Sequence, residues 1–250
     1  MAVFCVYKPK KMTSYQCVER FRTERGFGPE VVLGYAGRLD PMAEGLFLIL
    51  EGEDNKRQAE FFGLDKEYEA ELVFGIRTDS YDVLGLPDLD FRPSAQFTEK
   101  NALGSVLEPY IGTFEQEVPA YSAVRVAGKP LFWWAKQGRL AEIEIPRYPR
   151  TIHEIEILSL KTVGSAALQE EIRSAISGIE GHFRQQEIVD AWRVYFAKNV
   201  TDDFISAHLR IACSSGTFIR QLVHDIGRDL GCGAIVTRLV RTKIGEYAEK

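Results

Sequence analysis

The stretch Gly34-Tyr35-Ala36-Gly37-Arg38-Leu39-Asp40-Pro41-Met42-Ala43-Glu44-Gly45 surrounds one aspartate with three glycines and a proline. Glycine permits backbone conformations that other residues avoid, and Pro41 disfavours the helical region for Asp40. The five residues that follow, 46–50, are all apolar and predict a short buried strand. We therefore expect Asp40 to lie on a shaped loop held by a rigid strand. Turns favour the same residues for local reasons, so a simple turn-capping role for Asp40 is the alternative.

The composition is that of a globular protein. The chain has 250 residues, of which 45% are hydrophobic and 27% charged, enough for one large domain or two small ones. Its four cysteines form no Cys-x-x-Cys pair, so reduced cytosolic thiols are expected rather than disulfides or a zinc site. No eighteen apolar residues run together, which argues against secretion and membrane spanning. The net charge of −5 argues mildly against nucleic-acid binding, although local basic clusters can override it.

The N-terminal segment predicts a strand, a basic turn and a helix. Val3 to Tyr7 is apolar and leads into Lys8-Pro9-Lys10-Lys11. Thr13 or Ser14 can then cap a helix that runs to about Arg25. This region is locally positive. Phosphate binding is one interpretation of the turn, and a solvated charged surface is the other.

The segment from Glu67 to Phe74 alternates with the period of a strand. Tyr68, Ala70, Leu72 and Phe74 share one face, and three glutamates share the other. Tyr68 therefore points inwards. It is either an ordinary core aromatic or a stacking platform for a flat substrate.

The middle of the chain interleaves basic and aromatic residues. Helices are expected at about 55–62, 98–110 and 131–137, a polar loop at 77–93, and a strand at 151–160. The run Phe132-Trp133-Trp134 is followed by Arg139, Arg147 and Arg150. This pattern suits an RNA-facing surface, although the aromatic residues could equally belong to the core.

Residues 164–200 change to helical periodicity. Apolar residues recur at spacings of four and three, and Gly178 and Gly181 interrupt the pattern once. We expect two amphipathic helices that pack as a hairpin on the sheet rather than form a separate domain.

The C-terminal part predicts a strand from Ala207 to Cys213 and then a helix capped within Ser214 to Thr217. Arg220 would lie in the first turn of that helix, where a cation opposes the helix dipole. A nearby anion would compensate, and Asp40 is the best candidate, because a guanidinium would keep its carboxylate ionised and oriented. The alternative is an exposed Arg220 without a partner.

Taken together, these segments resemble the TruB family of tRNA pseudouridine synthases. The resemblance covers nearly the whole chain outside 164–200. The matching motifs are Lys8-Pro9 with Thr13-Ser14; Gly34-x-x-Gly37-x-Leu39-Asp40-Pro41-x-Ala43-x-Gly45; Lys66-x-Tyr68; Gly75-x-Arg77-Thr78-Asp79-x-x-Asp82; Pro119-x-Tyr121-Ser122-Ala123; Gly128; Ala135-x-x-Gly138; Cys213-Ser214-x-Gly216-Thr217-x-Ile219-Arg220; and Gly231-Cys232-Gly233-Ala234.

The resemblance implies an α+β fold in which helices flank a long, bent, mixed and mostly antiparallel sheet. It implies a cytoplasmic, monomeric enzyme that isomerises a uridine in the T loop of tRNA, conventionally position 55, with no cofactor and no metal. By motif match, Asp40 is the catalytic nucleophile, Tyr68 stacks on the base, Arg220 pairs with Asp40 and Leu239 packs in the pocket. Lys8 is expected to contact substrate. The uridine must leave its stack, which an aromatic pocket with a basic surround would favour.

Three departures from the family pattern affect function. Tyr35 stands where the family usually has histidine; its ring could still stack on RNA, with different hydrogen bonding. The family commonly continues into a small RNA-binding domain called PUA, whereas this sequence ends at Lys250. We therefore expect a single catalytic domain over residues 1–250, without PUA. The helical insert at 164–200 either compensates by touching tRNA or is purely structural.

Two other functions stay open at this stage. One is the same chemistry on a different RNA uridine. The other is a catalytically silent tRNA-binding chaperone, although such a protein has no need of the combination of Asp40, Tyr68 and Arg220.

Overall fold

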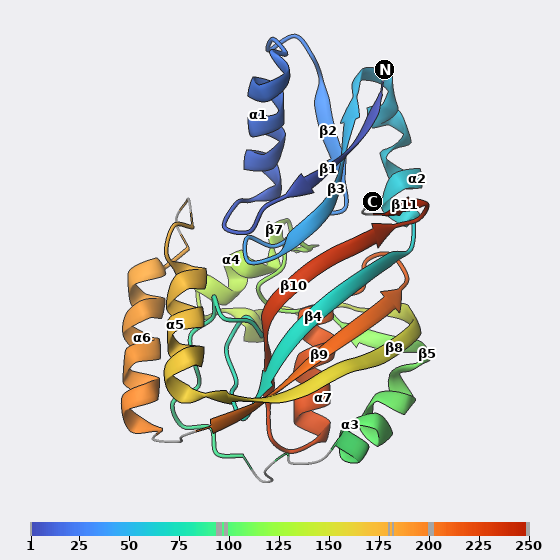
Figure 1. Ribbon diagram of the computed structural model, residues 1–250. Helices are drawn as coiled ribbons and strands as arrows, with labels where there is room; N and C mark the ends of the chain where they lie inside the picture. Colours follow the sequence, from blue (N-terminus) through green and yellow to red (C-terminus); the bar gives the residue numbers. More distant parts are fainter. Residues whose placement is uncertain are drawn as a thin grey trace.

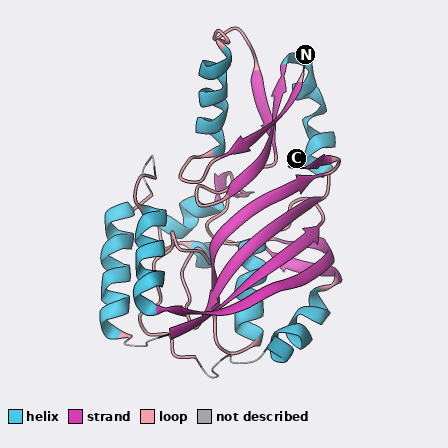
Figure 2. Ribbon diagram, in the orientation of Figure 1, coloured by secondary structure: helices cyan, strands magenta, loops and turns pink. Residues whose placement is uncertain are grey.

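The computed structural model describes residues 2–93, 97, 100–179, 181, 183–199 and 203–248. Its centre is a nine-stranded sheet with the main order β1-β3-β10-β4-β9-β8-β5, to which β2 adds beside β3 and β11 beside β10. Every pairing is antiparallel except that of β3 with β10. Helices flank this sheet (Figures 1 and 2). The predicted α+β class with a mixed, mostly antiparallel sheet is therefore confirmed.

The elements occur in the following order along the chain. The strands are β1 (Val3–Lys8), β2 (Leu33–Ala36), β3 (Glu44–Glu51), β4 (Lys66–Phe74), β5 (Gly112–Glu117), β6 (Arg125–Val126), β7 (Lys129–Pro130), β8 (Arg147–Gly164), β9 (Asp203–Cys213), β10 (Ala234–Ile244) and β11 (Tyr247–Ala248). The α-helices are α1 (Ser14–Arg25), α2 (Gln58–Gly63), α3 (Lys100–Leu107), α4 (Leu131–Lys136), α5 (Ser165–Ile176), α6 (Gln185–Lys198) and α7 (Ile219–Asp229). Short 3-10 turns, η1 (Gly52–Arg57), η2 (Glu108–Tyr110) and η3 (Leu140–Glu142), complete the set.

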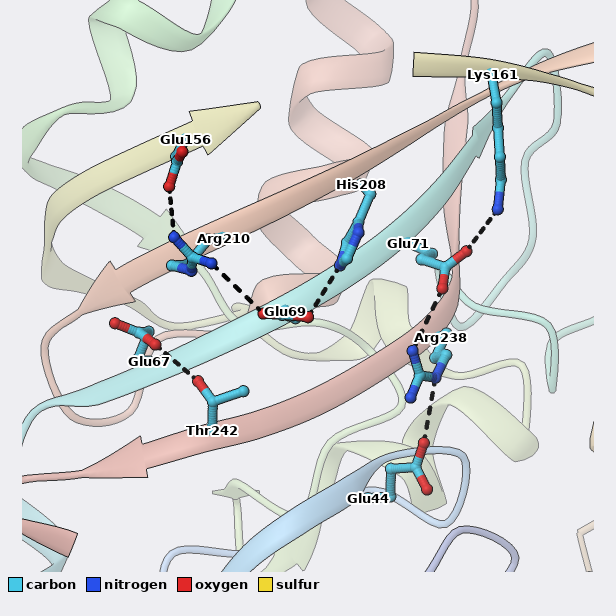
Figure 3. Close-up of polar contacts among 10 residues, drawn as sticks. All are labelled: Glu44, Glu67, Glu69, Glu71, Glu156, Lys161, His208, Arg210, Arg238 and Thr242. Carbon is cyan, nitrogen blue, oxygen red and sulfur yellow. Dashed lines mark hydrogen bonds and ion pairs between the residues drawn. The ribbon is translucent and has the colours of Figure 1, made fainter. Parts of the chain in front are cut away.

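The two faces of β4 differ as its alternating sequence predicts. Tyr68, Ala70, Leu72 and Phe74 are buried in the main core, against α3 and α7. The opposite face carries the glutamates, which form ion pairs and hydrogen bonds with residues from β8, β9 and β10, and Arg238 of β10 also pairs with Glu44 of β3 (Figure 3). Polar side chains thus satisfy one another on the open face, while apolar burial on the other face stabilises the sheet.

The N-terminal layer follows its local chemistry closely. Thr13 is the N-cap of α1, and its hydroxyl accepts the amide of Gln16 while Gln16 Oε1 accepts the amide of Thr13. This capping box fixes the start of the helix, and Gly26 ends it in the left-handed conformation. The helix buries Cys17, Val18 and Phe21 against the apolar strand β3. The predicted helix from Thr13 or Ser14 to Arg25 is confirmed.

The segment 164–200, which we expected to be an insert, forms the expected helical hairpin over its described residues. Its helices α5 and α6 pack on each other and on one end of the sheet, at the left of Figure 1. Trp192 is buried and donates its indole N–H to the carbonyl of Val83, 3.1 Å away. The hairpin shares its apolar cluster with Ile76, Phe204 and Ile235. Deleting the insert would therefore expose part of the core.

The helices expected at 55–62 and 98–110 are confirmed over their described residues, partly as 3-10 helix, and the predicted cap of α7 is wrong. The helix expected at 55–62 begins as a 3-10 turn, and α2 covers only its second half. The part of the helix expected at 98–99 lies outside the described residues; α3 ends at Leu107 and a 3-10 turn follows. Residues 214–217 do not cap α7 through a side chain. Instead Gln116, on β5, accepts the amide of Phe218 at 2.9 Å and donates to its carbonyl at 3.0 Å.

Candidate active site

The Asp40 loop is held between β2 and β3 by a buried arginine. Gly37 and Gly45 have positive φ values of 76° and 112°, and the backbone of β10 lies against Gly45 so closely that a Cβ there would be 2.3 Å from the carbonyl oxygen of Arg241. The Arg241 side chain donates to the carbonyls of Leu46 at 2.8 Å and Gly37 at 3.2 Å. Both ends of the loop are therefore tied to one guanidinium.

Arg220 and Asp40 meet in this loop as the sequence predicts. Arg220 Nε donates to Asp40 Oδ2 at 2.6 Å. The Arg220 side chain is 4% exposed and that of Asp40 is 40% exposed, so the carboxylate faces outwards from a buried cation. Arg220 also donates to the carbonyls of Ser80 at 2.5 Å and Tyr121 at 3.2 Å. An exposed, unpartnered Arg220 is excluded.

A second carboxylate lies on the buried side of Arg220. Asp82 Oδ2 is 3.5 Å from Arg220 Nε, and Asp82 Oδ1 accepts the Ser80 hydroxyl at 2.6 Å and the Leu84 amide at 2.9 Å. Burial raises the pKa of Asp82 to about 6, although Arg220 and the Ser80 hydroxyl oppose the rise. Burial by itself would lower the pKa of Arg220, but the Asp40 and Asp82 carboxylates outweigh it and the pKa is raised. Arg220 is therefore held in its charged form.

Tyr68 and Leu239 lie in the apolar cluster beneath the loop. Both are buried, at 8% and 5% exposure, in the same cluster as Leu39 and Met42, which flank Asp40 in the sequence. Arg241 pairs with Tyr68 across β10 and β4. Burial raises the pKa of the Tyr68 hydroxyl, and the nearby Arg241 guanidinium opposes that rise. An aromatic ring and an aliphatic side chain thus belong to the apolar cluster against which the Asp40 loop packs.

Lys8 and Tyr35 are placed differently from the other candidates. Lys8 is fully buried, and its ammonium donates to the carbonyls of Ala43 at 2.7 Å and Pro9 at 3.0 Å. Burial lowers the pKa of Lys8 to about 8. Its bonds therefore go to the Asp40 loop itself. Tyr35 packs its ring 5.3 Å from that of Phe47, on the side of β3 that faces α1.

Three residues that hold the site were not singled out from the sequence: Arg241, Asp82 and Ser14. The Ser14 hydroxyl donates to the carbonyl of Leu39 at 3.1 Å and accepts its amide at 3.0 Å, which fixes the residue before Asp40. Asp82 was visible only as part of a motif. An arginine in the apolar run of β10 was the available signal for Arg241, because a charged residue at a buried strand position needs polar partners.

Within the described part of the chain, no three His, Cys, Asp or Glu side chains are grouped so that they could hold a metal ion. No helix among the described residues is both long and apolar enough to cross a membrane.

Comparison with solved structures shows the fold. The chain aligns over 99% of its length with a chain of a Cbf5-Nop10-Gar1 complex, at a TM-score of 0.60 and 20% identity. It aligns equally completely with a chain of an H/ACA RNP bound to a substrate RNA containing 2′-deoxyuridine, at a TM-score of 0.56 and 18% identity. The present chain spans about half the length of each, 50% and 49%.

Relatives found by sequence are more nearly identical to this chain than these solved structures are. tRNA pseudouridine synthase B of Bordetella pertussis is 35% identical over 217 residues, which cover 86% of this chain and 70% of the relative. The protein of the same name from Desulfotalea psychrophila is 33% identical, covering 98% of this chain and 82% of its own length. That from Flavobacterium johnsoniae is 30% identical, covering 99% and 90%.

The fold and these relatives together define a pseudouridine synthase, an enzyme of the isomerase class. Two family profiles narrow this class: that of the TruB family pseudouridylate synthase N-terminal domain matches residues 27–178, and that of the tRNA pseudouridylate synthase B C-terminal domain matches residues 220–250. The chain belongs to the TruB family of pseudouridylate synthases.

Proposed function

We propose that this protein converts a uridine in the T loop of tRNA, conventionally position 55, to pseudouridine, with Asp40 as the catalytic residue. The observation that carries the proposal is the 2.6 Å bond between buried Arg220 and half-exposed Asp40. A carboxylate oriented by a hydrogen bond from a neighbouring guanidinium, with part of its surface open, is poised to act on a bound nucleoside. The curated relatives are named as tRNA pseudouridine synthases.

The reaction is an isomerisation and needs no external reactant. The bond from N1 of uracil to C1′ of the sugar breaks, the base turns while it is held, and C5 bonds to C1′. C5 loses its proton and N1 gains one, so that atoms and electrons balance. The Asp40 carboxylate serves either as a nucleophile towards the sugar or as a base that removes a sugar proton, and the Arg220 pair suits both roles.

The flipped base has an apolar platform in this proposal. We assign Tyr68 to stacking on the base and Leu239 to packing beside it, because both lie under the residues that flank Asp40. We assign the Tyr35 ring, which packs beside that of Phe47, to contact with the RNA. Lys8 was expected to contact substrate; because its ammonium donates to the carbonyls of Pro9 and Ala43, we assign it to support of the Asp40 loop.

Basic and aromatic residues outside the loop support RNA as the partner. Phe132 on α4 is 38% exposed with Lys136 5.8 Å above its ring, and Tyr148 on β8 is 40% exposed with Arg150 at 5.2 Å. Arg38, two residues before Asp40, is also exposed. Exposed rings and adjacent cations are the groups that hold unstacked bases and phosphates. We assign the T stem-loop of tRNA to this surface.

We further propose that the enzyme acts as a monomer in the cytoplasm. One chain supplies Asp40, Arg220, Tyr68 and Leu239, so the site needs no second copy. All four cysteines are free, which fits a reducing compartment.

The test is site-mapped pseudouridine formation in an unmodified tRNA transcript, with wild type and Asp40→Asn compared. We expect modification of the T-loop uridine by wild type and none by the variant. Modification of another uridine would move the target and keep the chemistry. Binding of tRNA by wild type without pseudouridine at any site would overturn the catalytic assignment and favour a chaperone.

A further inference from the structure

The helical insert places one side chain beside the catalytic pair. Arg184 precedes α6 in the left-handed conformation, with φ of 60° and ψ of 30°, and its side chain is 21% exposed. Its Nη2 lies 3.0 Å from Asp79 Oδ2, and its guanidinium carbon stands 4.7 Å above the ring centre of Tyr121. Asp79 and Tyr121 belong to segments 42 residues apart in the sequence, so Arg184 joins two loops.

Those two loops hold Arg220. The carbonyl of Ser80, next to Asp79, accepts Arg220 Nη1, and the carbonyl of Tyr121 accepts Arg220 Nη2. Both backbone acceptors of Arg220 are therefore on, or adjacent to, residues that Arg184 contacts. Two side-chain contacts of Arg184 converge on the groups that aim Arg220 at Asp40.

The contacted residues are themselves fixed. Asp79 Oδ1 accepts the Leu86 amide at 2.8 Å, so its carboxylate is anchored while Oδ2 meets Arg184. Burial, followed by the Asp79 charge, raises the pKa of Tyr121 to about 12, so its ring is neutral at pH 7. A neutral ring and an anchored carboxylate are both good partners for a guanidinium.

We propose that Arg184 is a positioning residue for pseudouridine formation: it clamps Asp79 to Tyr121, so that the carbonyls of Ser80 and Tyr121 hold Arg220 against Asp40. The insert then has a catalytic purpose that is different from tRNA binding. This inference rests on the proposed function, because its effect is on the Asp40 reaction.

The other charges of the insert argue against an RNA-binding role. Residues 164–200 contain five acidic and four basic residues, a net charge of −1 with histidine neutral. Arg173 and Arg193 are exposed and pair with acidic residues three positions away, Glu170 and Asp190. Phosphate binding needs an excess of basic charge, which these helices do not supply. Arg184 differs because its partner lies outside the insert.

The experiment compares Arg184→Gln with Arg193→Gln in the full-length chain. Arg193 is a matched control on the helix that follows Arg184, since its side chain is 74% exposed and pairs with Asp190 on the same helix. Single-turnover pseudouridine formation with saturating enzyme gives the rate constant, titration with tRNA transcript gives Kd, and thermal melting gives the folded fraction. Arg184→Lys and Asp79→Asn, with the Asp79→Asn/Arg184→Gln double variant, complete the set. Wild type and Asp40→Asn are run alongside.

We expect Arg184→Gln to lower the rate constant about tenfold at unchanged Kd, and Arg193→Gln to match wild type. Arg184→Lys should recover part of the rate, because it keeps the charge towards Asp79 and loses the planar contact with Tyr121. The double variant should be no slower than the slower single variant.

Two outcomes would overturn the inference. One is a folded Arg184→Gln that matches Arg193→Gln in rate. The other is a weaker Kd with an unchanged rate constant, which would make Arg184 an RNA contact. Inactivity of wild type is a separate result that refutes the proposed function. An active wild type with an inactive Asp40→Asn shows that the function stands whatever Arg184 does.

Discussion

Arg220 and Asp40, 180 residues apart in the sequence, are joined by a 2.6 Å ionic hydrogen bond although one side chain is buried and the other is 40% exposed. Because Arg220 also has Asp82 and two carbonyls around it, its charge is compensated from the protein side without Asp40. The two residues thus differ in their surroundings. Arg220 belongs to the core and has other groups that compensate its charge, and Asp40 is partly exposed to solvent.

Because of this difference, replacing Asp40 and replacing Arg220 should lower the free energy of unfolding by different amounts. Asp40→Asn should lower the free energy of unfolding by less than about 1.5 kcal/mol, because the remaining partners of Arg220 persist. Arg220→Gln should cost about 3–5 kcal/mol, because Asp82 is left as a buried, uncompensated carboxylate. Both variants should lose pseudouridine formation. Urea unfolding of each protein measures the contrast, and equal destabilisation by both would contradict it.

The raised pKa of Asp82 predicts that the free energy of unfolding depends on pH. Its pKa is about 6 in the folded chain, against an ordinary value of 3.8. Between these values the native state binds a proton that the unfolded state has released, so stability from this group rises as the pH falls from about 6 towards 4. Relative to Asp82→Asn, wild type should gain about 2 kcal/mol on going from pH 7 to pH 4.5. Urea unfolding of both proteins at the two pH values measures this gain. A parallel pH response of the two proteins would show that Asp82 titrates normally.

The close packing at Gly45 predicts that a side chain there would clash at the end of the Asp40 loop. An alanine Cβ there would lie 2.3 Å from the Arg241 carbonyl, at a φ of 112°. Gly45→Ala should cost about 2–4 kcal/mol and lower activity, because β3 and β10 must separate beside the Asp40 loop. Gly104→Ala in α3 is the control, since a Cβ there meets nothing within 4 Å. Denaturant unfolding should find the control neutral or slightly stabilised, and a similar result for Gly45→Ala would be inconsistent with this packing.

Elements with strong local signals could be predicted from the sequence. The Thr13 capping box and the alternation of Glu67 to Phe74 act within a few residues, and both correspond to the observed elements. Strand β10 gave no such signal, although it lies at the centre of the sheet between β3 and β4. Arg238, Arg241 and Lys243 interrupt its apolar pattern, and the partners of the two arginines come from distant segments. The prediction that residues 214–217 cap α7 was wrong for the same reason, because the observed partner of Phe218 is Gln116, 102 residues away.

Some contacts of the site could likewise be predicted from the sequence, and others could not. The Asp40–Arg220 contact followed from the need of a helix-terminal arginine for an anion, so it was predictable. The supports from Arg241 and Ser14 are long-range bonds to backbone carbonyls and an amide. The sequence marks Arg241 as a charge among apolar residues, but it does not show which backbone groups either side chain contacts. Whether the chain is one catalytic domain without a PUA extension stays a prediction.

Lys8 offers a test that separates loop support from substrate contact. Its ammonium is buried on the carbonyls of Pro9 and Ala43, so Lys8→Met removes the donor to the Ala43 carbonyl of the Asp40 loop. We expect kcat to fall about tenfold or more with little change in Kd for tRNA, since small displacements of a catalytic group are costly. Lys10 is the matched control, because it lies in the same turn and is exposed.

Lys10→Met should leave kcat unchanged and, if it alters binding, should do so more at low salt, as expected for a phosphate contact. Single-turnover rates and tRNA titrations at two salt concentrations distinguish the two lysines. If Lys8→Met instead weakens tRNA binding at an unchanged kcat, Lys8 reaches the substrate, and the turn must rearrange when RNA binds, because the ammonium would have to leave both carbonyls.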